Sequence, residues 1–206
     1  MAKAVENIPV KTISQFKSQL LGGGARPNLF EVDMATLPDG IAWPDAAKNG
    51  MQFLCKAATL PASNIAQIDI PFRGRIFKVA GDRTVEPWSI TVINDENFLI
   101  RNAMEAWVEK MAKLSDNKGN VNPQSYMATA DVYQLGRGSK PGTAGNTAID
   151  DGSENSVLKA YKFLDIFPTG VSAIDLSYDS SDALEEFTVE FQVNSFEVIS
   201  NAAANG

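Results

Sequence analysis

The chain has 206 residues and a mass of 22.2 kDa, which is long enough for one domain with a sizeable core. Hydrophobic residues make up 44% and charged residues 21%, so a disordered or collagen-like chain is excluded. The net charge is −7, from 18 Lys and Arg against 25 Asp and Glu, and this argues against tight nucleic-acid binding. There is no histidine and one cysteine, Cys55, which excludes Ser-His-Asp and Cys-His catalysis, His-ligated zinc, cysteine metal clusters and an internal disulfide.

Hydrophobic runs are only a few residues long, far short of the roughly 20 needed to cross a bilayer. The N-terminal residues 1–6 lack the apolar segment of a signal peptide. We therefore expect synthesis in the cytoplasm and no membrane insertion.

Residues 1–24 are predicted to form an N-terminal arm. Val10, Ile13, Phe16 and Leu20 have near-helical spacing, and the triple glycine at 22–24 indicates a hinge. A phosphate-binding loop is the alternative, but no Gly-Lys-Ser/Thr follows the glycines.

Alternating hydrophobicity and Pro/Gly turns predict short strands along the rest of the chain. They are expected at residues 28–32, 51–56, 88–92, 125–135, 158–167, 173–178 and 186–193. In addition, Gln67–Phe72 and Arg75–Val79 alternate on either side of Arg73-Gly74, which predicts a protruding hairpin. Pro71 favours an edge position in it, and Gly81-Asp82 is expected to be a turn.

One strong helix is predicted after the strand at 88–92, with Asn94 or Asp95 as its cap. Its apolar stripe, which must lie on the sheet, consists of Ile100, Ala103, Met104, Trp107, Met111 and Leu114.

These elements predict a mainly β fold: an antiparallel β-sandwich or partly closed barrel with one flanking helix. The β domain spans residues 25–200, with a flexible glycine-rich insertion at about 136–156 and a frayed tail at 201–206. In the last strand the alternation breaks at Ser195-Phe196, where we expect a bulge or bend.

No catalytic, cofactor or metal site is predicted, so we expect a protein that is not an enzyme. Ser14 and Lys17 have the S-x-x-K spacing of acyl-transfer sites, but the companion motifs are missing. Asp175, Asp179 and Asp182 lack the spacing of a calcium loop, and a turn explains them more simply. Asp95 and Glu96 are explained by their place at a helix start.

One concentration of basic and aromatic residues stands out in and beside the hairpin. It could contact nucleic acid, but Asp69, Asp82 and Glu86 dilute its charge, and we favour a subunit-contact surface. The predicted contact residues are Phe72, Arg73, Arg75, Phe77, Lys78, Asp82 and Arg83.

The sequence KVAGDRT at residues 78–84, followed by WSITVIND at 88–95, resembles the major tail tube proteins of contractile-tailed bacteriophages. Similar pieces follow the family's order over roughly residues 25–198: ARPNLF at 25–30, FLCKA at 53–57 and FPTGV at 167–171. The arm, the loop at 31–50 and the insertion are departures from the family.

The resemblance implies a tail-tube fold, related to the type VI secretion tube, whose subunits form hexameric rings with sheets joined edge to edge around a lumen. It further implies a virion component made in the host bacterium. The implied partners are copies of the chain, the tail sheath protein, the baseplate hub, the tape measure protein and the tail terminator. Double-stranded DNA would pass through without tight binding.

The polar face of the last strand is the candidate lumen surface, with Glu186, Thr188, Glu190 and Gln192. Carboxylates there would repel phosphates and keep DNA mobile. Two other functions stay open: the tube of a type VI secretion or other contractile injection system, and a small enzyme or carbohydrate-binding sandwich.

Overall fold

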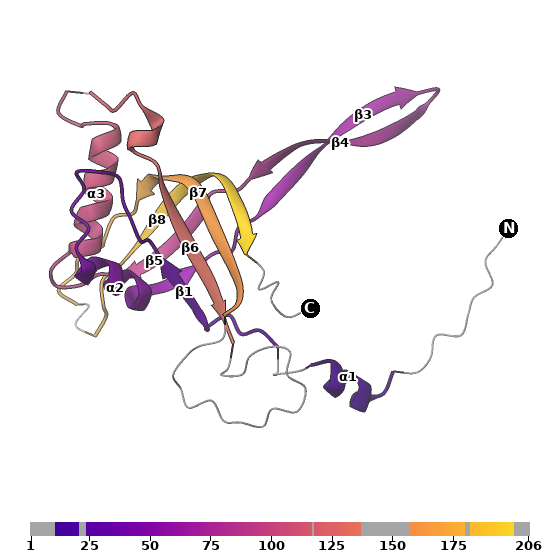
Figure 1. Ribbon diagram of the computed structural model, residues 1–206, viewed down its shortest axis with the longest axis horizontal. Coiled ribbons are helices and arrows are strands. Elements are labelled where there is room, and N and C mark those ends of the chain that lie inside the picture. Colours follow the sequence, from indigo (N-terminus) through magenta and orange to yellow (C-terminus); the bar gives the residue numbers. More distant parts are fainter. Residues whose placement is uncertain (1–10, 21–23, 117, 137–156, 180–181, 200–206) are drawn as a thin grey trace.

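A six-stranded antiparallel sheet forms the body of the protein (Figure 1), in the order β1-β6-β7-β8-β5-β2. Its strands are β1 Phe30–Asp33, β2 Cys55–Ala58, β5 Trp88–Ile93, β6 Ala128–Leu135, β7 Val157–Val171 and β8 Glu186–Ile199. The sheet curls until its end strands, β1 and β2, approach each other. The predicted partly closed, mainly β barrel is therefore confirmed.

The structure is a computed structural model, and it describes residues 11–20, 24–116, 118–136, 157–179 and 182–199. Most of the predicted insertion, the C-terminal tail, Val10 and two glycines of the predicted hinge lie outside the described residues.

Two helices pack against the sheet, where the sequence predicted one. The predicted helix is α3, Leu99–Met111, which buries Ile100, Ala103, Met104 and Trp107. It begins later than expected: the Oδ1 of Asp95 accepts a hydrogen bond from the Leu99 N–H at 3.1 Å, and Phe98, in a left-handed conformation, is the N-cap. The predicted stripe is too long by one residue, since Leu114 lies beyond the helix and is exposed.

The second helix, α2 Asp45–Leu54, corrects the strand predicted at residues 51–56. Ala47 and Met51 are buried one helical turn apart, and the chain becomes extended only at Cys55. A short apolar run such as MQFLC fits either element, and the helical spacing that includes Ala47 decides the outcome.

Aromatic side chains fill the core between the sheet and α3. Trp88 stacks on Phe163 with ring centroids 4.6 Å apart and lies 5.3 Å from Phe191, which in turn lies 5.9 Å from Trp107. Both indole N–H groups are satisfied: Trp88 donates to the carbonyl of Thr59 at 2.9 Å, and Trp107 to a carbonyl at 2.6 Å. The core therefore buries no unpaired indole.

The predicted hairpin is confirmed and is longer than expected. β3, Ser63–Phe72, pairs with β4, Arg75–Val85, as a separate two-stranded ribbon that projects from the body (Figure 1). Gly81-Asp82 is not a turn but part of β4, beside a register shift. A Cβ atom on Gly81 would lie 3.0 Å from the Ala66 carbonyl oxygen, so glycine permits the close approach of the two strands there.

β7 and β8 extend beyond their predicted limits, and residues 173–178, predicted as a strand, form their connection instead. The expected break in the alternation of β8 near Ser195 is present, and the register between β7 and β8 stays constant across it, since Leu164 pairs with Ser195 and Ile166 with Val193. In β7 the buried positions on either side of this point, Phe163 and Ile166, differ in parity, because Asp165 has φ 53° and the pairing of β6 with β7 shifts opposite it. In β8 the buried Val193 is followed by the half-buried Phe196. The bulge lies in β7, which is why the β8 sequence alone does not locate it.

The predicted arm helix is present as α1, Ile13–Gln19, with a capping box between Thr12 and Gln15. None of the helices in the part of the chain that the structure describes has the length and hydrophobicity of a membrane-spanning segment.

Replacing Phe163 by Ala should lower the free energy of unfolding by about 3–5 kcal/mol, because it removes a fully buried ring and leaves a cavity against Trp88. Urea unfolding of the unassembled chain measures this. The matched control is Phe53→Ala: that ring is 84% exposed, and its loss should change stability by at most about 0.5 kcal/mol. Equal effects of the two substitutions would contradict the assigned core.

Candidate subunit-contact surfaces

The hairpin exposes a continuous row of large apolar side chains. Residues paired across an antiparallel ribbon share a face, and Ile68 pairs with Val79, Ile70 with Phe77 and Phe72 with Arg75. Phe72 is 66% exposed and Phe77 63%. We define the apolar face of the hairpin as Ile68, Ile70, Phe72, Phe77 and Val79. Such a surface in water is typical of a protein contact.

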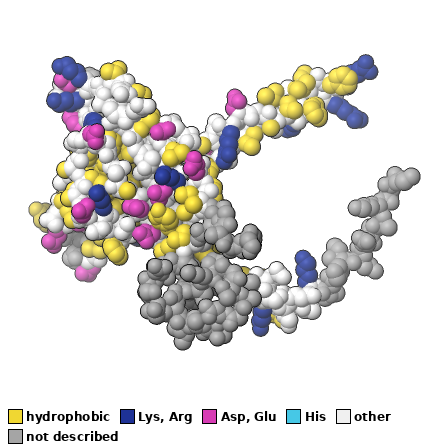
Figure 2. All heavy atoms as spheres, viewed as in Figure 1, with side chains coloured by type: hydrophobic (Ala, Val, Ile, Leu, Met, Phe, Trp, Pro, Cys, Tyr) yellow, Lys and Arg dark blue, Asp and Glu magenta, His cyan; other side chains and the backbone are white. Residues whose placement is uncertain are grey.

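The tip of the hairpin is basic. Arg73 and Arg75 flank the turn, and Figure 2 shows dark blue side chains at the far end of the projection. The Arg73 guanidinium lies 5.3 Å from the centre of the Phe72 ring. Among the described residues neither arginine has an ion-pair partner, so both positive charges are available to another molecule.

The other predicted contact residues lie on different parts of the hairpin. Lys78 lies on the opposite face, where its Nζ donates to the Oε1 of Gln67 at 3.2 Å. Arg83 lies at the base: its Nη2 donates to the Ser63 Oγ at 3.0 Å, and its guanidinium lies 5.4 Å from the Phe196 ring of β8. Asp82 is exposed beside the bulge. The structure therefore separates a tip group from a base group that joins the hairpin to the body.

The sheet has two open margins, because β1 pairs only with β6 and β2 only with β5 among the described strands. Next to the β1 margin, Asp33 of β1 lies directly opposite Asp131 of β6, and Glu31 lies opposite Tyr133. These acids were not among the residues predicted from the sequence. Their signal is the alternation of Glu31 and Asp33 around buried Val32, which marks the outer face of an edge strand.

Burial raises the pKa of the Asp131 carboxyl; the positive charge of Lys162 lowers it, and the negative charge of Asp33 raises it further. The Oδ1 of Asp131 is buried without a hydrogen-bond partner among the described residues. The pKa of Tyr133 is also raised, first by burial and then by the neighbouring carboxylates of Asp131, Asp33 and Glu31. This margin holds like charges that cost stability in a single copy.

The four candidate lumen residues share one face of β8, with Phe187, Val189, Phe191 and Val193 buried on the other. Glu186 forms an ion pair with Lys56 of β2 at 2.6 Å, and the hydroxyl of Thr188 lies 3.3 Å from that of Thr91 on β5. Glu190 is exposed, and Gln192 is half-buried. The polar face predicted from the alternation is therefore continuous across β2, β5 and β8.

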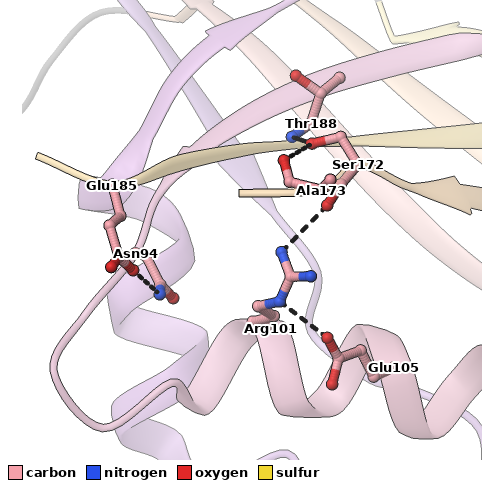
Figure 3. Close-up of polar contacts among 7 residues, drawn as sticks. All are labelled: Asn94, Arg101, Glu105, Ser172, Ala173, Glu185 and Thr188. Atoms are coloured by element: carbon pink, nitrogen blue, oxygen red, sulfur yellow. Dashed lines mark hydrogen bonds and ion pairs between the residues drawn. The ribbon is translucent and has the colours of Figure 1, made fainter. Parts of the chain in front are cut away.

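The connection between β7 and β8 is fastened at both ends (Figure 3). Ser172 and Thr188 exchange hydrogen bonds of 2.8 Å, and the Nη1 of Arg101 donates to the Ser172 carbonyl at 3.2 Å. At the other end, the side chain of Asn94 donates to the Glu185 carboxylate at 3.0 Å. These contacts hold the connection against α3 and against the end of β5.

The acid-base and metal candidates do not converge on a site. Among the described residues no group of three His, Cys, Asp or Glu side chains could hold a metal. The Asp95 carboxylate accepts a hydrogen bond from the first N–H of α3, and Ser14 and Lys17 lie on the exposed α1. Burial raises the pKa of the Cys55 thiol to about 12, so it is not ionised at neutral pH.

A projecting hairpin and open sheet margins on a curled antiparallel barrel are features of a subunit built for assembly. The sequence model of the phage tail tube protein family matches residues 25–199. The chain therefore belongs to the phage tail tube protein family, which confirms the resemblance, and it is a structural component of the virion tail.

The chain is 30% identical over 176 residues to the tail tube protein gp19 of Enterobacteria phage T4, covering 85% of this chain and 93% of that protein. Its fold is similar to a chain of the six-fold symmetrised anti-feeding prophage baseplate, with TM-score 0.55 and 9% identity over 86% of this chain and 96% of that one. It is also similar to a chain of the sheath-tube complex of an extracellular contractile injection system, with TM-score 0.50 and 12% identity over 93% and 99% of the two chains.

Replacing Asp131 by Asn should raise the stability of the unassembled chain at pH 7 by about 0.5 kcal/mol, because it removes one of two opposed carboxylates. Solvent screening at this partly exposed site keeps the effect small. The folded-state pKa lies above the ordinary value, so the wild-type group supports folding when protonated and loses that contribution as the pH rises through the folded pKa.

The advantage of the Asn variant should therefore shrink toward pH 3, as followed by urea unfolding across pH. Asp39→Asn, at an exposed carboxylate, is the control and should show no such trend. If the difference in the free energy of unfolding between the Asp131→Asn variant and the wild type grew at low pH, the predicted direction of the pH dependence would be wrong.

Proposed function

We propose that the chain forms hexameric rings that stack helically into the hollow inner tube of a contractile phage tail, through which DNA is ejected. The observation that carries this proposal is the pair of open sheet margins beside a hairpin with exposed apolar side chains, in a member of the tail tube family. The six-fold symmetry of the similar baseplate assembly supports six copies in a ring.

The margins supply the ring joint. β1 of one copy would pair with an open margin of the next, so that the curled sheets continue around the ring. Each backbone hydrogen bond across the joint would contribute a net free energy of about 0.5–1.5 kcal/mol, and a four-residue strand makes a few of them. A closed ring repeats this contact at every interface.

The hairpin supplies the contact between copies beyond the sheet margins. Burying one of its large apolar side chains would contribute about 1.5–3 kcal/mol, so the apolar face of the hairpin can stabilise an interface substantially. Its arginines at the tip would select an acidic surface on the adjacent ring.

The polar face of β8 would line the lumen, with Glu186, Thr188, Glu190 and Gln192 toward the passing DNA. Phosphates and carboxylates repel each other within a Debye length of about 8 Å, so the wall would not hold the genome. The outer wall would bind the tail sheath protein, consistent with the similar chain in a sheath-tube complex. The ends would bind the baseplate hub and the tail terminator, with the tape measure protein inside before ejection.

The second candidate is the tube of a contractile injection system, which the similar solved folds favour. The phage tail is preferred because the tail tube protein of phage T4 matches in sequence as well, at 30% identity, whereas the two solved chains named above match at 9% and 12%. No step of catalysis is assigned in either case. Negative-stain microscopy of the purified chain should show rings or hollow rods; a strictly monomeric chain at high concentration, even on a baseplate seed, would refute both candidates.

Reversing the charge of Arg75 should leave the subunit folded and impair tube assembly. The side chain lies at the exposed tip and makes no ion pair among the described residues, so Arg75→Glu removes only a contact to another copy. We expect an unchanged circular dichroism spectrum and a several-fold lower yield of pelleted tubes.

Lys113→Glu is the control, since it makes the same charge change beyond the end of α3 and should leave the yield unchanged. Arg83→Glu should also reduce the yield, with some loss of stability because it breaks the contacts with Ser63 and Phe196. Full tube yield with Arg75→Glu would remove the hairpin tip from the interface.

Reversing the charge of Glu190 should turn a repelling wall into an adhesive one. In assembled tubes, Glu190→Lys would place a ring of positive charges on the lumen face, and DNA that enters would be retained. DNA retention after nuclease treatment measures this, with Glu96→Lys as the control at an exposed carboxylate outside β8. Equal retention by the two variants would place Glu190 outside the lumen.

A further inference from the structure

The arm helix α1 has an apolar face that nothing in the described part of its own chain covers. Ile13, Phe16 and Leu20 recur at helical spacing, Phe16 is 63% exposed, and no residue of the helix is buried. Isolated helices this short are marginal in water. The capping box at Thr12 supports the helix locally, so α1 is a preformed amphipathic helix without a surface to lie on.

The arm is basic, whereas the rest of the chain is acidic. Residues 1–24 carry three Lys and one Glu, a net charge of +2, and the remaining residues carry 15 Lys and Arg against 24 Asp and Glu, a net charge of −9. Within the described helix region the charges are Lys11 and Lys17. The arm is therefore complementary in charge to the body of another copy of this chain.

One surface of the body is complementary to α1 both in its exposed apolar side chains and in its charge. The β7–β8 connection, at residues 173–179 and 182–185, exposes Leu176, Tyr178 and Leu184. Between and beside these side chains lie only acidic charges, at Asp175, Asp179, Asp182 and Glu185. We call this surface the acidic connection.

The acidic connection is held in place at its ends by the contacts drawn in Figure 3, from Arg101 to Ser172 and from Asn94 to Glu185. Its exposed apolar side chains therefore lie on a segment whose two ends are fixed to the body. Sequence position alone does not suggest the match, since more than 150 residues separate Leu20 from Asp175.

The two surfaces lie on opposite sides of the body. In Figure 1, α1 is at the lower right, and the connection that leads into β8 is at the left margin, next to α2 and α3. Complementary surfaces on opposite sides of one subunit form a head-to-tail contact, which closes into a ring when the rotation between subunits allows it. The body between them disfavours docking within one copy.

We propose that α1 of one copy binds the acidic connection of a neighbouring copy in the same tube. Ile13, Phe16 and Leu20 pack against Leu176, Tyr178 and Leu184, and Lys11 and Lys17 face the carboxylates of Asp175, Asp179 and Asp182. This contact rests on the proposed tube. It would join neighbouring copies in addition to the pairing of their sheet margins, and we call it the clasp. The match to the family begins at residue 25, so α1 lies outside the matched region, whereas the acidic connection lies within it.

Disulfide trapping in assembled tubes of the full chain tests the contact. Cys55 is the only cysteine, and it is buried with its thiol pKa raised to about 12, so it should not interfere. The double variant Phe16→Cys with Tyr178→Cys should give, on mild oxidation, a ladder of covalent multimers on a non-reducing gel.

The control pairs Phe16→Cys with Leu114→Cys, at a residue 88% exposed beyond α3, and should give no ladder beyond that of the single variants. Tubes that form normally but give no ladder, or give cross-linked monomers only, would overturn the clasp and leave the tube proposal standing. An equal ladder in the control would overturn it as well.

A charge swap gives an independent readout. Lys17→Glu or Asp179→Lys alone should raise the critical concentration for assembly about two- to fivefold, the range of one exposed ion pair. The double variant should return to near the wild-type value. Persistent impairment of the double variant would overturn the pairing, whereas a wild-type chain that never assembles would overturn the tube together with the clasp that rests on it.

Discussion

The packing of Trp88 is the interaction on which the rest of this structure depends. Its ring stacks on Phe163 of β7 and approaches Phe191 of β8, and through Phe191 the cluster reaches Trp107 of α3. Three neighbouring strands and a helix are thereby fixed to one another by rings that exclude water. This packed interior stabilises the fold, and the same chain can therefore leave two sheet margins and a long hairpin without partners and still stay folded.

Much of the fold could be predicted because alternation and helical spacing report directly on burial. The hairpin around Arg73-Gly74 and the buried side of α3 follow from those periods. Other features depend on contacts between distant segments. The helix α2 becomes apparent only when Ala47 is counted together with the apolar run after it. The break in alternation at Ser195 accompanies a bulge at Asp165, in the neighbouring strand.

For the candidate contact surfaces, the sequence indicates the types of side chain but not their arrangement in space. The basic and aromatic residues of the hairpin stand out in the sequence, yet only the structure separates Arg75 at the free tip from Arg83, which is held against Phe196. The acids beside β1 escaped notice because a pair such as Asp33 and Asp131, nearly a hundred residues apart, becomes a pair only through strand register. The polar face of β8 could be predicted because the alternation within a single strand defines it.

The hairpin is joined to the body by very short segments: β4 ends at Val85, and β5 begins three residues later at Trp88. Arg83 adds a side-chain contact with β8 at the same point. A load applied to the projecting ribbon is therefore delivered to the central tryptophan with little slack between. In the proposed tube, a hairpin held this firmly would pass torsion from one ring to the next as a stiff rod does, instead of absorbing it in flexible joints.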